Sequence, residues 1–130
     1  MTQTKILLVD DLKPVLMAVA ELLRDHFVIV GMVSHASEVL KAAEALSPDV
    51  IVMDISMPGI SGIDITKELR LRGSQASIVF LTVHEDSDIA ATAMAAGGSG
   101  YVLKELMGSD LIPAIRDSLA GRVFLSRFPR

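Results

Sequence analysis

The strongest constraint on the fold is a short apolar run, Val50-Ile-Val-Met53, that ends in a single acid, Asp54. Pro58, Gly59 and Gly62 follow within a few residues. A short apolar run that is rich in β-branched residues and bounded by turn residues is typical of a buried parallel strand. Ligands bind at the carboxyl ends of such strands. We therefore expect Asp54 to lie at a functional edge of a sheet.

A second run of the same type, Ile6-Leu-Leu-Val9, ends in two acids, Asp10 and Asp11. If both runs form central parallel strands, the three carboxylates converge on one small site. Thr82 and Lys104 end two later apolar runs. The same argument brings their hydroxyl and ammonium groups to this edge.

The rest of the chain alternates between strand and helix patterns. Further strands are predicted at residues 27–30, 77–82 and 101–103. Helices are predicted between the strands, from apolar positions at helical spacing such as Val15, Val19 and Leu22. Strict alternation indicates an α/β fold with a doubly wound, five-stranded parallel sheet and helices on both faces. Right-handed crossovers favour the flavodoxin-like strand order 2-1-3-4-5.

Local signals set several helix ends. Ser87 or Asp88 is predicted to cap the fourth helix, and Ser109 to cap the fifth, which ends at Gly121. Pro113 removes a backbone donor and predicts a late start for that fifth helix. Its apolar face is expected to comprise Leu111, Ile115 and Leu119.

The composition narrows the class of protein. The 130 residues predict one domain over residues 1–121 and a basic, apolar tail or linker stub over 122–130. A net charge of −4 argues against direct binding of nucleic acid. The chain contains no cysteine, so it has no disulfide framework. No apolar segment is long enough to span a membrane and no secretion signal is evident, so we expect a cytoplasmic protein.

The repulsion between clustered carboxylates must be offset by positive charge or by protonation. Two unit charges 4 Å apart repel by about 4 kcal/mol at an effective dielectric constant of about 20. Hard oxygen ligands at a loop edge suit Mg²⁺, and Lys104 and Thr82 add a positive charge and a hydroxyl donor. Such a group can position and neutralise a phosphoryl group. An oxygen of Asp54 could then attack phosphorus and form an acyl phosphate.

Four segments closely resemble the receiver domain of two-component response regulators, over about residues 5–121: Asp10-Asp11, Asp54-Ile-Ser-Met-Pro-Gly-Ile-Ser-Gly62, Leu81-Thr82-Val-His-Glu and Gly100-Tyr-Val-Leu-Lys104. Each residue alone is more often a turn, a cap or a surface group. Their joint occurrence at successive strand ends supports the resemblance.

The resemblance implies that Asp54 accepts a phosphoryl group from a sensor histidine kinase. It implies that Asp11 and Asp54 bind Mg²⁺ with the backbone carbonyl of Ser56, and that Asp10 acts partly through water. Thr82 and Lys104 would hold the phosphoryl oxygens.

The resemblance also assigns roles around this site. Tyr101 would turn inward on activation and change the face formed by the fourth helix, fifth strand and fifth helix. Val83 would narrow access to the site, and Ser56 and His84 would tune hydrolysis of the acyl phosphate. By position alone, Tyr101 could equally be a core residue and His84 a surface histidine.

The predicted function is a phosphoryl-accepting signalling switch. It is not an enzyme, and at most it catalyses its own phosphorylation and dephosphorylation. The residues from Gly100 to the Lys104-Glu105 junction resemble regulators with a LuxR-type helix-turn-helix output, which implies control of transcription through a domain absent from this chain. The chain is also expected to form a homodimer.

The alternative functions are a stand-alone or non-phosphorylated interaction module and a small hydrolase with an aspartyl intermediate. Asp10-Asp11 lacks the acid-x-acid loop of such hydrolases.

Overall fold

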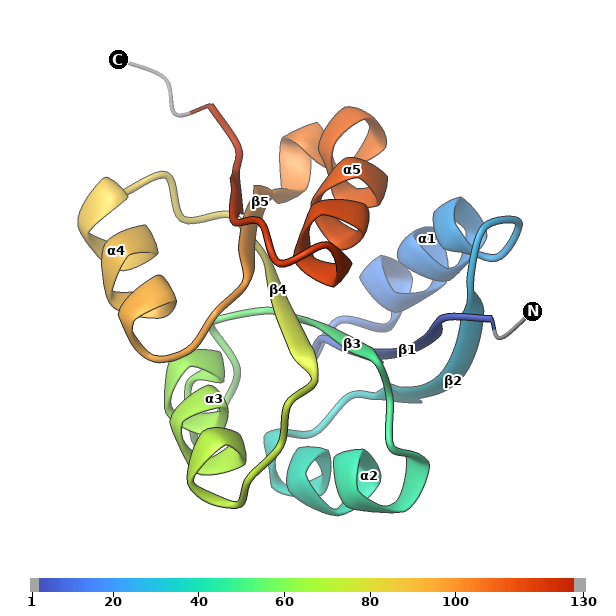
Figure 1. The fold of residues 1–130 in the computed structure, drawn as a ribbon, viewed down its shortest axis with the longest axis vertical. Helices are drawn as coiled ribbons and strands as arrows, with labels where there is room; N and C mark the ends of the chain where they lie inside the picture. The colour runs from blue at the N-terminus through green and yellow to red at the C-terminus, as the bar shows by residue number, and fades with distance from the viewer. Residues whose placement is uncertain (1–2, 128–130) are drawn as a thin grey trace.

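The sheet is parallel and has the strand order β2-β1-β3-β4-β5-β6 in the computed structural model, which describes residues 3–127 (Figure 1). The predicted α/β fold and the order 2-1-3-4-5 are confirmed, and a sixth strand extends them. The strands are β1 (Lys5–Val9), β2 (Val28–Val33), β3 (Val50–Met53), β4 (Ser77–Thr82), β5 (Gly100–Leu103) and β6 (Phe124–Leu125).

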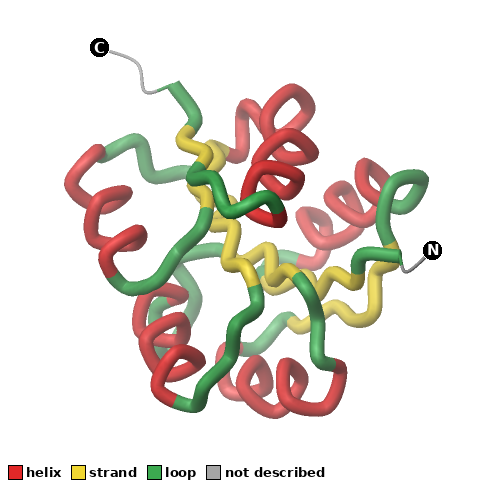
Figure 2. The backbone as a smooth tube through the Cα atoms, viewed as in Figure 1, coloured by secondary structure: helices red, strands yellow, loops and turns green. Residues whose placement is uncertain are grey.

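Helices cover both faces of the sheet, as Figures 1 and 2 show. Helices α1 and α5 lie on one face, and α2, α3 and α4 lie on the other. Their bounds are α1 (Lys13–Leu23), α2 (Val39–Leu46), α3 (Gly62–Leu71), α4 (Ser87–Ala95) and α5 (Met107–Leu119), with short 3₁₀ turns η1 (Ala36–Glu38) and η2 (Lys104–Leu106). Among the described residues, no helix is both long and apolar enough to cross a bilayer.

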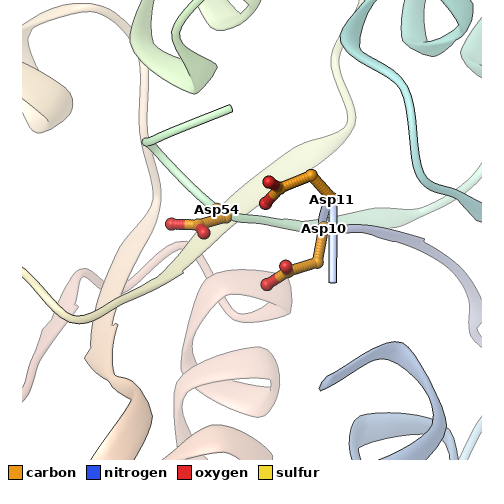
Figure 3. Close-up of side chains that lie close together, drawn as sticks. All are labelled: Asp10, Asp11 and Asp54. Atoms are coloured by element: carbon orange, nitrogen blue, oxygen red, sulfur yellow. The ribbon is translucent and has the colours of Figure 1, made fainter. Parts of the chain in front are cut away.

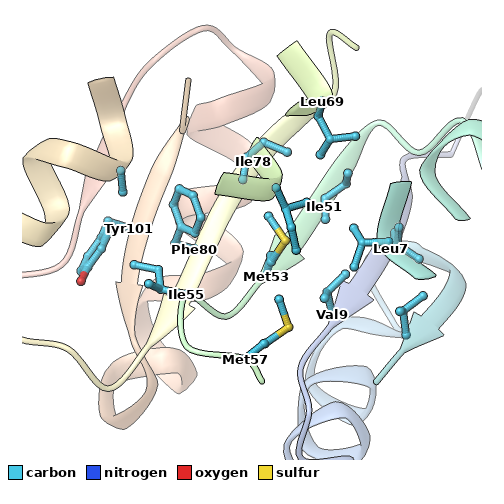
Figure 4. Close-up of a cluster of buried hydrophobic side chains, with 14 of the residues drawn as sticks. Leu7, Val9, Ile51, Met53, Ile55, Met57, Leu69, Ile78, Phe80 and Tyr101 are labelled. Carbon is cyan, nitrogen blue, oxygen red and sulfur yellow. The ribbon is translucent and has the colours of Figure 1, made fainter. Parts of the chain in front are cut away.

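The apolar core forms two layers, one on each side of the sheet. Alternate strand residues point to opposite faces, so Leu7 and Val9 pack with α2 and α3 while Ile6 and Leu8 pack with α1 and α5. Figure 4 shows part of the first layer, including Met53, Phe80 and Tyr101. The central strands read as continuous apolar runs because both of their faces are buried.

Strand β2 runs past the predicted end at Val30. It continues through Gly31 to Val33, and the pairing with β1 passes from Ile29 to Gly31, which leaves Val30 as a bulge. A side chain at Gly31 would approach Leu46 of α2 within 2.9 Å. This glycine therefore gives α2 room against the sheet and does not end the strand.

Two helix starts differ from the sequence prediction. The cap of α4 is Asp86, whose carboxylate accepts the N–H of Asp88 at 2.7 Å, so neither Ser87 nor Asp88 is the cap. Helix α5 begins at Met107, before Ser109, because η2 leads directly into it.

The remaining features of α5 follow from this early start. Pro113 lies inside the helix and does not delay it. The predicted apolar face is correct for Leu111 and Ile115, which are fully buried, but Leu119 is 44% exposed near the helix end.

A half-buried arginine, Arg70 of α3, joins the amino ends of two strands. Its guanidinium donates to the carbonyls of Ser74 and Ala76, which precede β4, at 3.0 and 2.7 Å. It also donates to the carbonyl of Gly97, in the loop before β5, at 2.7 Å. Gly97 has φ = 115°, and a side chain there would collide with Arg70. Burial lowers the pKa of Arg70.

The segment after α5 packs back onto the sheet. Phe124 and Leu125 form β6, which pairs in parallel with Gly100 and Tyr101 of β5. Ser126 follows and is 2% exposed. Sequence patterns did not predict this strand, and residues 128–130 of the predicted tail lie outside the described residues.

Candidate functional site

The three predicted acids lie together at the carboxyl ends of β1 and β3 (Figure 3). One carboxylate oxygen from each of Asp10, Asp11 and Asp54 lies within 4.8 Å of the others. Asp10 and Asp54 are buried and Asp11 is half-buried. The N–H of Asp54 donates to the carbonyl of Val9 at 3.1 Å, so backbone pairing continues past the strand ends and aligns the acids.

Lys104 joins two of these acids. Its ammonium lies 2.9 Å from Oδ2 of Asp10 and 3.1 Å from Oδ2 of Asp54. Lys104 comes directly after β5, at the same sheet edge. The structure therefore brings together the predicted acids and the predicted cation.

Burial and charge act against each other in this group. Burial raises the pKa of Asp10, even though Lys104 and the N–H of Leu12 favour its charged form. Burial alone would lower the pKa of Lys104, but its hydrogen bonds to Asp10 and Asp54 outweigh that effect and raise it. Both pKa values rise because desolvation dominates at Asp10 and ion pairing dominates at Lys104.

The loop after Asp54 depends on Gly62. The N–H of Gly62 donates to the carbonyl of Ile55 at 2.8 Å. A Cβ atom at position 62 would lie 2.2 Å from the carbonyl oxygen of Asp54, which no side chain can tolerate. Sequence reasoning treated Gly62 as a turn residue, but this contact shows that it fixes the backbone of Asp54.

The predicted hydroxyl, Thr82, is buried at the end of β4. Its Oγ1 accepts the N–H of His84 at 3.3 Å. Between them, Val83 is 67% exposed. Its effect on access to the site remains a prediction.

Ser56 and His84 form a bridge between two loops beside the acids. Oγ of Ser56 lies 2.5 Å from Nε2 of His84. The N–H of Ser56 also donates to Oδ1 of Asp54 at 3.3 Å. Sequence reasoning named both residues but missed their contact, because residues 28 apart carry no pattern that pairs them. Metal binding by the carbonyl of Ser56 remains a prediction.

Tyr101 is fully buried and points inward. Its hydroxyl donates to the carbonyl of His84 at 2.9 Å. Burial, followed by the negative charges of Asp86 and Asp54, raises the pKa of Tyr101 to about 12. The phenol is therefore neutral and links β5 to the loop that follows Thr82.

The donor set at the acids fits a hard divalent cation. Three carboxylates face one ammonium, which leaves two negative charges at the site. Mg²⁺ prefers carboxylate oxygens and keeps several waters, and half-buried Asp11 leaves the site accessible to solvent.

Comparisons with known proteins bear on the family of the chain. A family model described as the response regulator receiver domain matches residues 6–116. The chain is 38% identical over 124 residues to a nitrate/nitrite response regulator protein homolog of Haemophilus influenzae, covering 94% of this chain and 60% of that protein. It is 34% identical over 124 residues to the response regulator GacA of Pseudomonas aeruginosa, covering 94% and 58%. The chain thus spans about three fifths of the length of these curated relatives.

One similar crystal structure is a two-component response regulator of the LuxR family from Aurantimonas sp. SI85-9A1. The two structures share a TM-score of 0.90 and 35% sequence identity, over 96% of this chain and 91% of that chain.

Proposed function

This chain belongs to the response regulator receiver domain family and resembles its LuxR-family members, and from that premise we propose that Asp54 is its phosphoryl acceptor. As a member of this family, the chain is a signalling phosphoacceptor and not an enzyme that turns over an external substrate. The observation that carries the assignment is the ammonium of Lys104, which bridges Asp54 and Asp10 beside a third carboxylate.

The residues at the site have different roles in phosphoryl transfer. Asp10, Asp11 and Asp54 would hold Mg²⁺ together with the carbonyl of Ser56. The metal, when bound, neutralises the charge of the phosphoryl oxygens. An oxygen of Asp54 attacks phosphorus, the bond from phosphorus to the donor breaks, and an acyl phosphate forms. In this scheme the chain catalyses both its own phosphorylation and its dephosphorylation.

The acyl phosphate gives Lys104 and Thr82 new partners. The ammonium of Lys104 already lies 3.1 Å from Asp54 and can pair with a phosphoryl oxygen. The hydroxyl of Thr82 accepts the N–H of His84, so its own proton can be donated to a second phosphoryl oxygen. Both contacts require only local movement at strand ends.

A series of contacts carries the change outward from Thr82. Movement of Thr82 toward the phosphoryl group shifts His84, whose N–H it holds. His84 in turn accepts the hydroxyl of Tyr101 through its carbonyl. The expected result is a changed surface over α4, β5 and α5, which would bind a partner or a second copy of the chain. We propose a sensor histidine kinase as the donor and transcription as the output, through a LuxR-type domain that lies outside this chain.

The test is phosphorylation with a small phosphodonor and Mg²⁺. Wild-type protein should acquire a base-labile adduct on Asp54, located by mass spectrometry after hydroxylamine or borohydride trapping. Asp54→Asn is the matched control and should acquire none. An adduct on another residue, or no adduct while a known receiver domain reacts in parallel, contradicts the proposal.

A second candidate function is an interaction module that works without phosphorylation. The inward Tyr101 favours it, because this arrangement is the one expected of the activated state. Titration with Mg²⁺ separates the two. A phosphoacceptor should bind the metal, and Asp54→Asn should weaken that binding sharply, whereas an interaction module should show no binding that depends on Asp54.

A further inference from the structure

Ser126, beyond the last helix, makes three hydrogen bonds that tie the chain to β5 and α5. Its Oγ accepts the N–H of Leu103 at 3.1 Å and donates to Oδ2 of Asp110 at 2.7 Å. Its own N–H donates to the carbonyl of Tyr101 at 2.8 Å. A serine that is 2% exposed and bonded on both sides of Val102 is a specific anchor for this segment.

The anchor acts next to the phosphoryl-holding cation. Leu103 is the last residue of β5, immediately precedes Lys104 and is the N-cap residue of η2. The hydrogen bond to Leu103 N–H therefore helps to fix the backbone position from which the Lys104 side chain reaches Asp10 and Asp54. Without Ser126, the end of β5 would be an unpaired sheet edge with an unsatisfied donor at this point.

We propose that Ser126 is a positioning residue for Lys104, and that residues 122–127 complete the receiver unit and do not merely leave it. The inference rests on the proposed function, since Lys104 holds the phosphoryl group in that scheme. A small displacement of a group that stabilises charge in phosphoryl transfer weakens its effect strongly. Loss of the anchor should therefore weaken phosphoryl binding while the three acids remain in place.

The experiment compares Ser126→Ala with Ser109→Ala in the full chain. Ser109 donates to the other oxygen of the same Asp110 carboxylate at 3.0 Å, but it is exposed, and its other hydrogen-bond contact is the carbonyl of Leu106 in η2. Each variant is titrated first with Mg²⁺ and then with beryllofluoride, a phosphoryl analogue, in the presence of saturating Mg²⁺. Folding is checked by thermal melting.

We expect Ser126→Ala to bind beryllofluoride about five- to tenfold more weakly than wild type, with Mg²⁺ affinity no weaker than that of wild type, because Lys104 competes with the metal for the oxygens of Asp10 and Asp54. Ser109→Ala should match wild type in both titrations. Ser126→Thr keeps the hydroxyl and should restore most of the lost affinity. A purely structural role predicts that Mg²⁺ and beryllofluoride affinities fall together, and this result would overturn the proposal.

Amide hydrogen exchange at Leu103 provides a second measurement that does not need phosphoryl binding. The anchor predicts faster exchange in Ser126→Ala than in Ser109→Ala. Equal exchange, or equal affinity for beryllofluoride, refutes the inference and leaves the proposed function standing. If wild-type protein bound no beryllofluoride, the proposed function would fail instead, and the exchange rates would still decide whether Ser126 fixes Leu103.

Discussion

Two half-buried cations stand at opposite ends of the sheet and have opposite surroundings. Lys104, at the carboxyl end, contacts two carboxylates, and those contacts raise its pKa despite burial. Arg70, at the amino end, contacts the neutral carbonyls of residues 74, 76 and 97, and burial lowers its pKa. The first cation neutralises acids that could bind another cation. The second donates hydrogen bonds to backbone carbonyls and contacts no acid in those bonds.

The difference separates a functional contact from a structural one. In the proposed scheme, the carboxylates at the Lys104 end exchange the ammonium for a metal ion, and the ammonium exchanges a carboxylate for a phosphoryl oxygen. The hydrogen-bond partners of Arg70 are neutral carbonyls with no carboxylate among them, so they provide no negative charge that a metal ion could neutralise in its place. The planar guanidinium matches these carbonyls in a way that a lysine could not. We therefore expect changes at Arg70 to affect stability and changes around Lys104 to respond to ligands.

The largest expected effect is from Arg70→Ala. Half-buried carbonyls lose a charged donor, so the free energy of unfolding should fall by about 3 kcal/mol, as measured by urea denaturation. Arg72→Ala, at an exposed position of the same helix end, is the control and should change stability by less than about 0.5 kcal/mol. Saturating Mg²⁺ should not correct the Arg70 defect. If Mg²⁺ restored the stability of Arg70→Ala, the proposed difference between the Arg70 and Lys104 ends of the sheet would be wrong.

Lys104→Met should cost about 2.5 kcal/mol of unfolding free energy at pH 7 without Mg²⁺, because two clustered carboxylates lose their cation. Mg²⁺ should restore much of this loss, since it binds the folded state and replaces the missing positive charge. Lys104→Met should also bind Mg²⁺ more tightly than wild type, because ammonium and metal compete for the same oxygens. Weaker Mg²⁺ binding in this variant would show that Lys104 supports the metal site instead of competing with it.

A third buried group, the phenol of Tyr101, is a weak acid that donates its hydrogen bond to the backbone carbonyl of His84. Its pKa rises from an ordinary value of 10.0 to about 12, so in this pH window the unfolded chain loses its phenolic proton before the folded chain does. The stabilisation is present below pH 10 and is lost as pH approaches 12. The stability difference between wild type and Tyr101→Phe should therefore shrink by about 2 kcal/mol across that window, in urea denaturation at successive pH values. A constant difference would show that the phenol ionises as readily in the folded state.

The smallest expected effect is an increase in folding stability in Asp10→Asn. Burial raises the pKa of this carboxyl, so the folded state disfavours its charged form and stability at pH 7 is lower than it would be below that pKa. A neutral amide should raise the melting temperature by an amount equivalent to about 1 kcal/mol and should weaken Mg²⁺ binding. Asp25→Asn, at an exposed position, should do neither. Loss of stability in Asp10→Asn would mean that the ion pair with Lys104 outweighs the cost of burial.

The site could be predicted from the sequence because each of its residues ends an apolar run. Asp10, Asp54 and Lys104 directly follow strands and Thr82 is the last residue of one, and a parallel sheet places all such positions at one edge. The predicted topology alone was therefore enough to place these residues near one another, and no side-chain contact had to be known.

Contacts between loops could not be predicted in this way. The bridge between Ser56 and His84, and the three carbonyls around Arg70, join residues whose spacing follows no helical or strand period. The two-residue strand β6 also lacks a periodic pattern, because it is too short to show one. Backbone pairing with β5 and the buried hydroxyl of Ser126 stabilise it, and these interactions exist only once the sheet has formed.

The direction of β6 sets where the polypeptide leaves the fold. Helix α5 returns the chain to the amino end of the sheet, and β6, being parallel to β5, carries it forward again to the rim that bears Asp54. Neighbouring strands lie about 4.8 Å apart, so β6 lies about 14 Å across the sheet from β3, the strand that Asp54 follows. In the proposed scheme, movement around phosphorylated Asp54 would reach a segment joined at this rim directly, and no helix would have to transmit it.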